Sequence, residues 1–214
     1  ALLYQYEIDR EFPDAVMLEA KATPQSVEES AVAGRLDLRD KVVITIDGAS
    51  SKDLDDAVSL ERDGLGRWVL GVHIADVSHY VRPGSALDLE AWERGTSVYF
   101  ADQVVPMLPR ELSNGICSLN PRVDRLALSC VMTLTPEGEV VDHTIAKSVI
   151  RTTERMTYED CNALLAHSDP ALAERYARIL PMLEDMAALS RVLEGRRRRR
   201  GALELDTRES YVVC

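Results

Sequence analysis

The chain has 214 residues, of which 46% are hydrophobic and 29% are charged, and its formal net charge is −11 at pH 7. That length can bury one substantial core or two small ones. The sequence contains neither an apolar stretch of membrane-spanning length nor a basic-then-apolar signal pattern, so we expect a cytoplasmic protein without membrane spans. The acidic balance argues against a nucleic-acid coat, but it leaves room for a cleft where acidic residues hold metal ions.

The first 40 residues are predicted to form a lead-in segment or linker from a preceding domain. They contain a short amphipathic helix within "EFPDAVMLEA" and a polar connection, "PQSVEESAVAGRLDLRD". From Lys41 the pattern becomes that of a folded domain, which we expect to occupy residues 41–214.

Strand signals dominate the next part of the chain. β-Branched content predicts strands over 41–47, 56–61, 67–76, 126–135 and 140–152. Asp63-Gly64 and "PEGE" mark turns between neighbouring strands. Ser85 can cap a short helix that ends at Gly95. The stretch over 101–115 is expected to be an ordered but irregular crossing.

After Thr157 the hydrophobic period becomes helical. One helix follows Thr157, and Asp169-Pro170 begins another, whose apolar stripe runs from Leu172 to Leu193 and which we expect Pro181 to kink. A strand-like "SYVVC" ends the sequence. Together these elements predict an α+β fold with a mixed, largely antiparallel sheet and packed helices.

The segment "ITIDGASSKDLDD" (44–56) contains four carboxylates within a stretch of ten residues: Asp47, Asp53, Asp55 and Asp56. Carboxylates a few ångströms apart repel one another, and burial raises the cost. Lys52 supplies a single positive charge, so divalent metal is the economical compensation. Two hard cations held by carboxylates could stabilise both the attacking and the leaving oxygen of a phosphoester displacement.

Three other interpretations of this loop fit the sequence less well. A solvated surface loop would be favoured on composition alone, but the apolar flanks "VVITI" and "AVSL" place it at the end of a core sheet. The spacing does not match a calcium-binding loop. A phosphatase-type nucleophile should directly follow a strand, whereas Asp53 follows "SSK".

Two further stretches accompany the aspartates: "GVHIADVSHYV" (71–81) and "RGTSVYFADQVVPMLPRELSNGICSLNP" (94–121). Together, in order and spacing, the three blocks resemble the catalytic RNB domain of the ribonuclease II and ribonuclease R family of exoribonucleases. The resemblance covers Val42 to the end of the chain. It implies that residues 41–214 form an incomplete, N-terminal portion of that catalytic domain.

The resemblance implies 3′→5′ hydrolysis of single-stranded RNA to nucleoside 5′-monophosphates with Mg²⁺, or with Mn²⁺ in its place. The family's four metal-site aspartates correspond to Asp47, Asp53, Asp55 and Asp56, and the loss of Asp55 is expected to abolish the chemistry. The tyrosine that stacks on a 3′-terminal base corresponds to Tyr99, which could otherwise be a half-buried aromatic at a strand edge. Cold-shock-like and S1 RNA-binding domains are expected elsewhere in a longer chain.

The sequence departs from the family pattern in two ways. Leu205 stands where relatives commonly have a second base-stacking phenylalanine. The family's catalytic arginine comes later in the domain and is absent here, so we expect the isolated chain to have little or no activity. The alternative hypothesis is a catalytically silent module that binds RNA or protein.

Several other polar residues admit two interpretations. Arg94 could contact RNA phosphate or cap the preceding short helix. Arg196–Arg200 could steer RNA or simply end a helix in solvent. His73 and Asp76 lie an odd number of residues apart on a predicted strand, so we expect structural hydrogen-bonding roles, with Asp76 close to the aspartate cluster.

Overall fold

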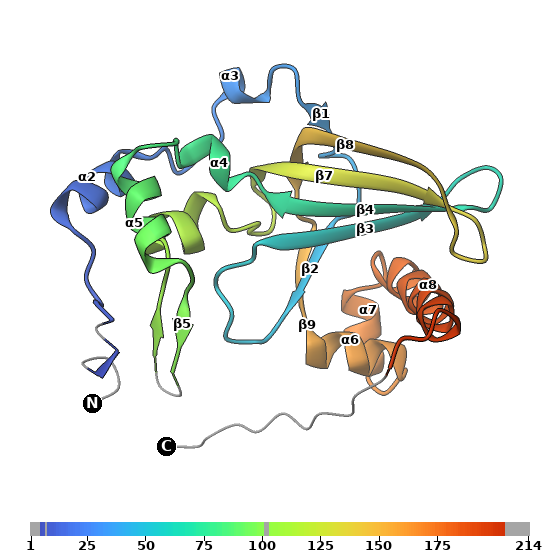
Figure 1. The fold of residues 1–214 in the computed structure, drawn as a ribbon. Coiled ribbons are helices and arrows are strands. Elements are labelled where there is room, and N and C mark those ends of the chain that lie inside the picture. Colours follow the sequence, from blue (N-terminus) through green and yellow to red (C-terminus); the bar gives the residue numbers. More distant parts are fainter. Residues whose placement is uncertain (1–4, 7, 101–102, 204–214) are drawn as a thin grey trace.

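The structure is a computed structural model that describes residues 5–6, 8–100 and 103–203. Its centre is a seven-stranded sheet with the strand order β1-β8-β7-β4-β3-β2-β9 (Figure 1). β1 pairs with β8 and β2 pairs with β9 in parallel, and the other pairs are antiparallel, which confirms the expected mixed sheet. The strands are β1 Leu36–Asp37, β2 Ile44–Asp47, β3 Asp56–Arg62, β4 Trp68–Ala75, β7 Asp124–Leu134, β8 Val140–Arg151 and β9 Glu154–Thr157.

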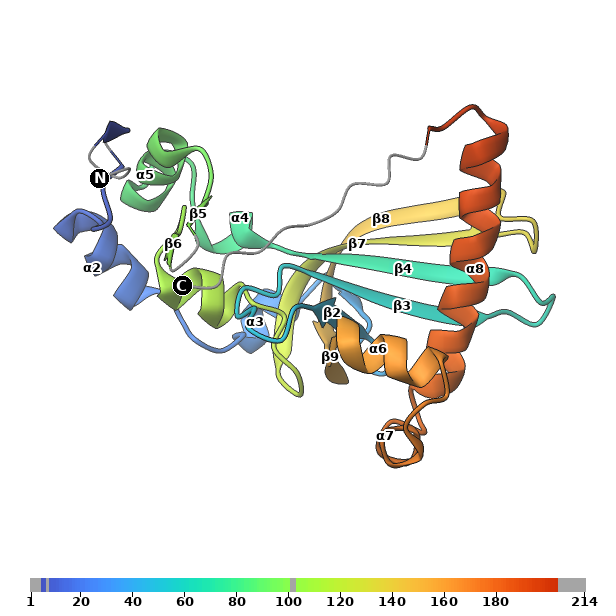
Figure 2. The same ribbon diagram turned by 90° about the horizontal axis from the view of Figure 1, so that it is seen from below.

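Two groups of helices flank the sheet, and a small ribbon of β5 (Val98–Tyr99) and β6 (Val104–Val105) lies beside the first group. Figures 1 and 2 show α2 and α5 at one end of the sheet, while α6 and α8 lie against one of its faces. The helices are α2 Asp14–Ala22, α3 Glu29–Val32, α4 Val77–Tyr80, α5 Ala86–Arg94, the π-type helix η1 Glu111–Ile116, α6 Tyr158–Leu165, α7 Pro170–Arg175 and α8 Leu180–Arg199. In the described ranges, no helix is long and apolar enough to cross a membrane.

The larger core lies between the sheet and the C-terminal helices. Ile44, Leu60 and Trp68 from the sheet pack against Leu164 of α6 and Leu183 of α8. Burying apolar side chains of this size stabilises the fold by about 1.5–3 kcal/mol each. This contact fixes the position of β2 and β3, the two strands between which the aspartate-rich loop runs.

A second core joins the N-terminal segment to the region after β4. Val16 and Ala20 of α2 pack with Leu87 of α5 and with Leu112 and Ile116 of η1. The first 40 residues therefore contribute a helix to this core and β1 to the sheet. The predicted domain boundary at residue 41 stays a prediction.

The predicted helix boundaries are confirmed where a side chain caps the helix. Ser85 accepts a hydrogen bond from the Asp88 N–H at the start of α5, and Thr157 accepts one from the Asp160 N–H at the start of α6. α5 ends at Gly95, whose φ of 68° lies in the left-handed region that glycine adopts without a Cβ clash.

The single helix expected over 170–193 is wrong in one respect. The chain forms two helices instead, because α7 ends at Arg175 and α8 begins at Leu180, with Pro181 in its first turn. Proline has no N–H to donate, so it is tolerated at the start of a helix but not in its interior. The proline thus begins a helix here rather than bending one.

Candidate active site

The four aspartates lie along one loop between two adjacent strands. Asp47 is the last residue of β2 and Asp56 is the first residue of β3, and Asp53 and Asp55 lie on the connection between them. β2 and β3 are antiparallel neighbours, so this connection returns the chain beside itself. Asp47 is partly buried, whereas the other three carboxylates are exposed.

Their charges act on one another. Burial and the negative charges of Asp56, Asp55 and Asp53 raise the pKa of Asp47, and the positive charge of Arg155 opposes this rise. Burial is the largest cause of the rise, and the like charges of the neighbouring carboxylates add to it. Three carboxylates of the loop thus act electrostatically on the fourth, and their joint role as metal ligands stays a prediction.

Tyr99 lies beside this loop. Its hydroxyl donates a hydrogen bond to Asp53 Oδ2 at 3.3 Å, and the side chain is 67% exposed. Burial and the neighbouring Asp53 raise the pKa of the tyrosine hydroxyl, so it remains a donor. An exposed ring held by one polar contact at its tip leaves its faces open for stacking.

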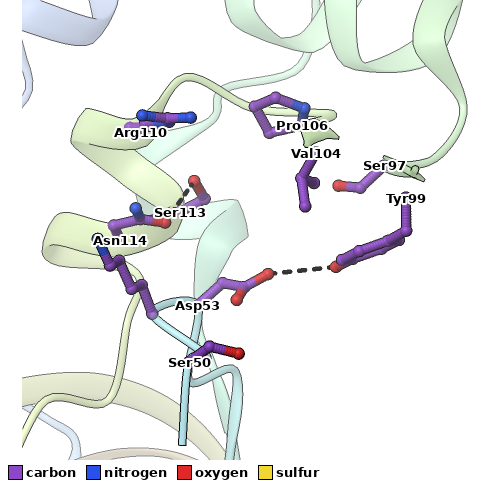
Figure 3. A pocket seen from close by; sticks show the side chains of 10 residues that line it. Ser50, Asp53, Ser97, Tyr99, Val104, Pro106, Arg110, Ser113 and Asn114 are labelled. Atoms are coloured by element: carbon purple, nitrogen blue, oxygen red, sulfur yellow. Dashed lines mark hydrogen bonds between the residues drawn. The ribbon is translucent and has the colours of Figure 1, made fainter. Parts of the chain in front are cut away.

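Tyr99 and Asp53 line a pocket of about 190 Å³. Figure 3 shows Arg110 and Asn114 on one side of it and Tyr99 on the other, with Asp53 between them. Lys52 also lines the pocket, and in the described part of the chain neither the Lys52 ammonium nor the Arg110 guanidinium has a hydrogen bond or ion pair with the protein. The pocket thus combines an aromatic face, a carboxylate and two cations with free donors.

The second half of the aspartate loop is bound to the segment that follows η1. The buried Ser118 hydroxyl donates to the Lys52 carbonyl at 2.9 Å and accepts from the Leu54 N–H at 3.1 Å. The Leu119 N–H donates to the Leu54 carbonyl at 2.7 Å, and the Ala75 N–H donates to the Asp55 carbonyl at 2.9 Å. These bonds fix the backbone on both sides of Asp53.

The first half of the loop is bound by Arg155, a residue that the sequence analysis did not single out. Arg155 lies on β9, and its Nη2 donates to the carbonyls of Gly48, Ala49 and Ser51 at 3.1, 2.8 and 2.8 Å. β9 pairs in parallel with β2, which brings the side chain to the loop across more than a hundred residues of sequence. Nothing in the local sequence of β9 signals this contact.

The Arg94 guanidinium is held by several contacts within the protein, and its predicted contact with RNA stays a prediction. Its guanidinium donates to Glu90 Oε1 at 2.8 Å and to the carbonyls of Asp9, Glu11 and Pro106, and the side chain is 10% exposed. It also lies over the Phe12 ring at 3.9 Å. These contacts favour the structural interpretation, in which Arg94 ties the N-terminal segment to α5 rather than capping that helix.

His73 and Asp76 are both buried in hydrogen-bonded structural roles, as expected. The His73 ring contacts the hydroxyls of Ser129 at 2.7 Å and Ser59 at 3.1 Å, and burial lowers its pKa to about 4. Asp76 accepts from Arg35 at 2.7 Å.

The basic tract lies away from the pocket. Arg196 donates to the Glu137 carbonyl in the β7–β8 turn, which adjoins the Trp68 end of β4. The aspartate loop adjoins the opposite, Ala75 end of that strand. The two interpretations of this tract both remain open, and Leu205 and "SYVVC" lie outside the described residues.

The donor chemistry of the loop fits a divalent cation. Carboxylate oxygens are the ligands that Mg²⁺ prefers, and four of them crowd one loop without an equal number of cations. Within the described residues, no three histidine, cysteine, aspartate or glutamate side chains converge on a common point as they are placed.

Fold and site together define a class: an α+β domain in which a loop with four carboxylates adjoins a pocket lined by one tyrosine and two cationic side chains. A family model described as "RNB domain" matches residues 35–214, and the chain belongs to this family.

The chain is similar to curated proteins named ribonuclease R. The chain is 52% identical over 212 residues to Ribonuclease R 1 of Lactococcus lactis, and 44% identical over 211 residues to Ribonuclease R of Escherichia coli. In both cases the match covers 99% of this chain and 26% of the relative, so the chain spans about a quarter of the length of these proteins.

The fold also matches that of a solved structure. Mycoplasma genitalium RNase R in complex with ribose-methylated single-stranded RNA has a TM-score of 0.90 and 32% identity, and the match covers 100% of this chain and 33% of that one. This agreement over the whole chain confirms the fold class.

Proposed function

We propose that this chain carries the aspartate-bearing part of a 3′→5′ exoribonuclease active site that hydrolyses single-stranded RNA to nucleoside 5′-monophosphates. The observation that carries the proposal is the hydrogen bond from Tyr99 to Asp53, because it joins a base-stacking face to the carboxylate cluster. The kinship with ribonucleases R, one of them solved with single-stranded RNA, supports the same activity.

Different residues of the pocket would bind the base and the phosphate of a 3′-terminal nucleotide. The exposed ring of Tyr99 offers a stacking face to any base, worth about 1–3 kcal/mol. Lys52 and Arg110 supply free cationic donors for phosphate oxygens. Arg110 takes the phosphate-contacting role that the sequence suggested for Arg94.

Asp47, Asp53, Asp55 and Asp56 would hold Mg²⁺, or Mn²⁺ in its place. When bound, such ions supply an activated water and stabilise the negative charge that develops on the phosphate. The Tyr99 hydroxyl bonded to Asp53 would orient that carboxylate, and the fixed Asp55 backbone would limit where its side chain can reach.

The setting of this activity is part of the proposal. We assign it to the cytoplasm and to a longer chain, in which cold-shock-like and S1 domains would bring RNA to the site. The 214-residue chain alone is expected to have little or no activity, because the family's catalytic arginine follows later in the domain.

The test compares this chain with a longer one that spans the relatives' full length, using single-stranded RNA and Mg²⁺. Only the longer chain should release 5′-monophosphates. In it, Asp55→Asn should lower kcat by at least about a hundredfold while RNA binding persists. Tyr99→Ala should instead weaken RNA binding by about five- to a hundredfold, and Tyr99→Phe, which keeps the ring, should not.

Three outcomes contradict the proposal. Equal activity of both chains would show that no essential group is missing here. Normal turnover by Asp55→Asn would remove the role given to that residue. RNA binding without hydrolysis by the longer chain would favour the catalytically silent module.

A further inference from the structure

Three backbone carbonyls of the aspartate loop point at a single nitrogen atom. Nη2 of Arg155 lies 2.8–3.1 Å from the oxygens of Gly48, Ala49 and Ser51. Converging carbonyl oxygens carry partial negative charge and repel one another, so this turn needs a cation at its centre. In this loop the guanidinium provides it.

The turn has little else to hold it. Within the described residues, the carbonyls of Ala49 and Ser51 have no other hydrogen-bond donor, and the turn's own backbone bond runs from the Ser51 N–H to the Gly48 carbonyl at 3.1 Å. The second half of the loop, by contrast, is bound by Ser118, Leu119 and Ala75. The geometry of the first half therefore depends on Arg155.

The position of this turn decides how the carboxylates face one another. Gly48 directly follows Asp47, and Ser51 lies two residues before Asp53, so the turn joins the two acids. Arg155 lies on β9, which pairs with β2 in register Asp47↔Thr157, and β9 therefore moves with the strand that carries Asp47. The guanidinium thus ties the loop to the strand at its own base.

We propose that Arg155 is a positioning residue of the metal site: it acts as a built-in cation that curls residues 48–51 and so sets Asp47 and Asp53 for shared divalent-ion binding. The inference rests on the proposed function, since it presumes that the aspartates bind metal. Arg155 itself is assigned no contact with RNA or with the reacting atoms.

A positioning role and a merely electrostatic role of Arg155 predict opposite changes in divalent-ion affinity when the side chain is removed. If Arg155 acted only as a nearby positive charge, its removal would strengthen divalent-ion binding. If it shapes the loop, Arg155→Ala should weaken binding by about ten- to a hundredfold, the usual cost of losing a group that orients metal ligands.

The experiment is calorimetric titration of the 214-residue chain with Mn²⁺ and Mg²⁺, together with hydrogen exchange of the amides of residues 48–53. Arg155→Ala should lower affinity and speed exchange in that segment, and added guanidinium at non-denaturing concentration should restore part of both. Arg155→Lys has a side chain one bond shorter that is still charged, so its affinity and exchange rates should lie between those of the wild-type chain and of Arg155→Ala. Arg122→Ala is the matched control, because Arg122 bonds Glu154 of the same strand and does not touch the loop.

The outcomes separate the two proposals. Unchanged or higher affinity in Arg155→Ala overturns the positioning role, and so does a lower melting temperature with unchanged exchange at 48–53. If Arg155→Ala fails to fold, Arg155→Lys decides, and wild-type affinity and exchange in that variant overturn the inference. If the wild-type chain binds no divalent ion, the metal-dependent function fails, and the exchange rates alone decide whether Arg155 holds the loop.

Discussion

His73 shows how a single buried residue links this fold to pH. Its ring lies between the hydroxyls of Ser129 and Ser59 and is 1% exposed. The neutral ring can donate through one nitrogen and accept through the other, and the serine hydroxyls rotate to suit. A charged ring would have to be desolvated there, and this lowers the pKa of His73 to about 4.

The direction in which pH changes the stability of the fold follows from the pKa of His73 in the folded and unfolded states. The folded pKa lies below the unfolded value near 6.5, so protons favour the unfolded chain, and stability falls as pH drops from about 6.5 toward 4. Lowering pH from 7 to 5 should remove about 2 kcal/mol of the free energy of unfolding through this residue. Urea unfolding of the wild-type chain and of His73→Gln at pH 7 and pH 5 measures this loss. If the free energy of unfolding depends on pH equally in both chains, His73 is not its source.

At the scale of elements, the aspartate loop is a connection between β2 and β3 that is held from outside. Its first half is bound by β9 through Arg155, and its second half by the segment after η1 through Ser118. Both supports come from strands or turns that are remote in sequence. A loop that carries several like charges needs such bonds, because its own side chains push it apart.

Ser118 provides a test of this support. Ser118→Ala leaves the Leu54 N–H, on a residue that is 1% exposed, without its acceptor. We expect a loss of about 1–3 kcal/mol in the free energy of unfolding, the cost of an unsatisfied buried polar group. Chemical denaturation measures this loss, and Ser168→Ala is the control. The exposed Ser168 hydroxyl donates to the Ala163 carbonyl, and its removal should lower the free energy of unfolding by no more than about 0.5 kcal/mol. Equal losses in both variants would refute the special role of Ser118.

At the scale of the whole molecule, the N-terminal segment is joined to the sheet by a buried ion pair. Arg35, just before β1, donates to Asp76, just after β4, at 2.7 Å, and the two side chains are 6% and 4% exposed. The Ala75 N–H next to Asp76 also holds the Asp55 carbonyl. The pair therefore connects the start of the domain with the base of the aspartate loop.

Breaking this pair should be costly. Arg35→Met leaves a buried carboxylate without its partner, and we expect a loss of about 3–5 kcal/mol in the free energy of unfolding. Arg35→Met combined with Asp76→Asn should cost less than Arg35→Met alone, since no uncompensated charge remains. The exposed pair Arg122–Glu154 serves as control, where Arg122→Ala should change stability by about 0–1 kcal/mol. A double variant no more stable than Arg35→Met would contradict the ion-pair account.

The sequence by itself determined the local elements and the chemistry of the loop. β-Branched runs specified β2, β3, β4, β7 and β8, although not β1, β5, β6 or β9. Ser85 and Thr157 specified helix starts, and Asp47 and Asp53–Asp56 between apolar flanks placed an acidic loop at a sheet end. These features follow from neighbours within a few residues, where side-chain period and capping chemistry operate.

Only the tertiary structure decided which cationic side chains lie at the pocket and at the aspartate loop. The sequence suggested Arg94, but packing turned its donors to Glu90 and three backbone carbonyls, while Arg110 came to line the pocket with free donors. Arg155 reached the loop because β9 returns in parallel beside β2. Such partners are separated by long stretches of chain, and strand pairing brings them together; a one-dimensional pattern records residue types but not which distant strands become neighbours.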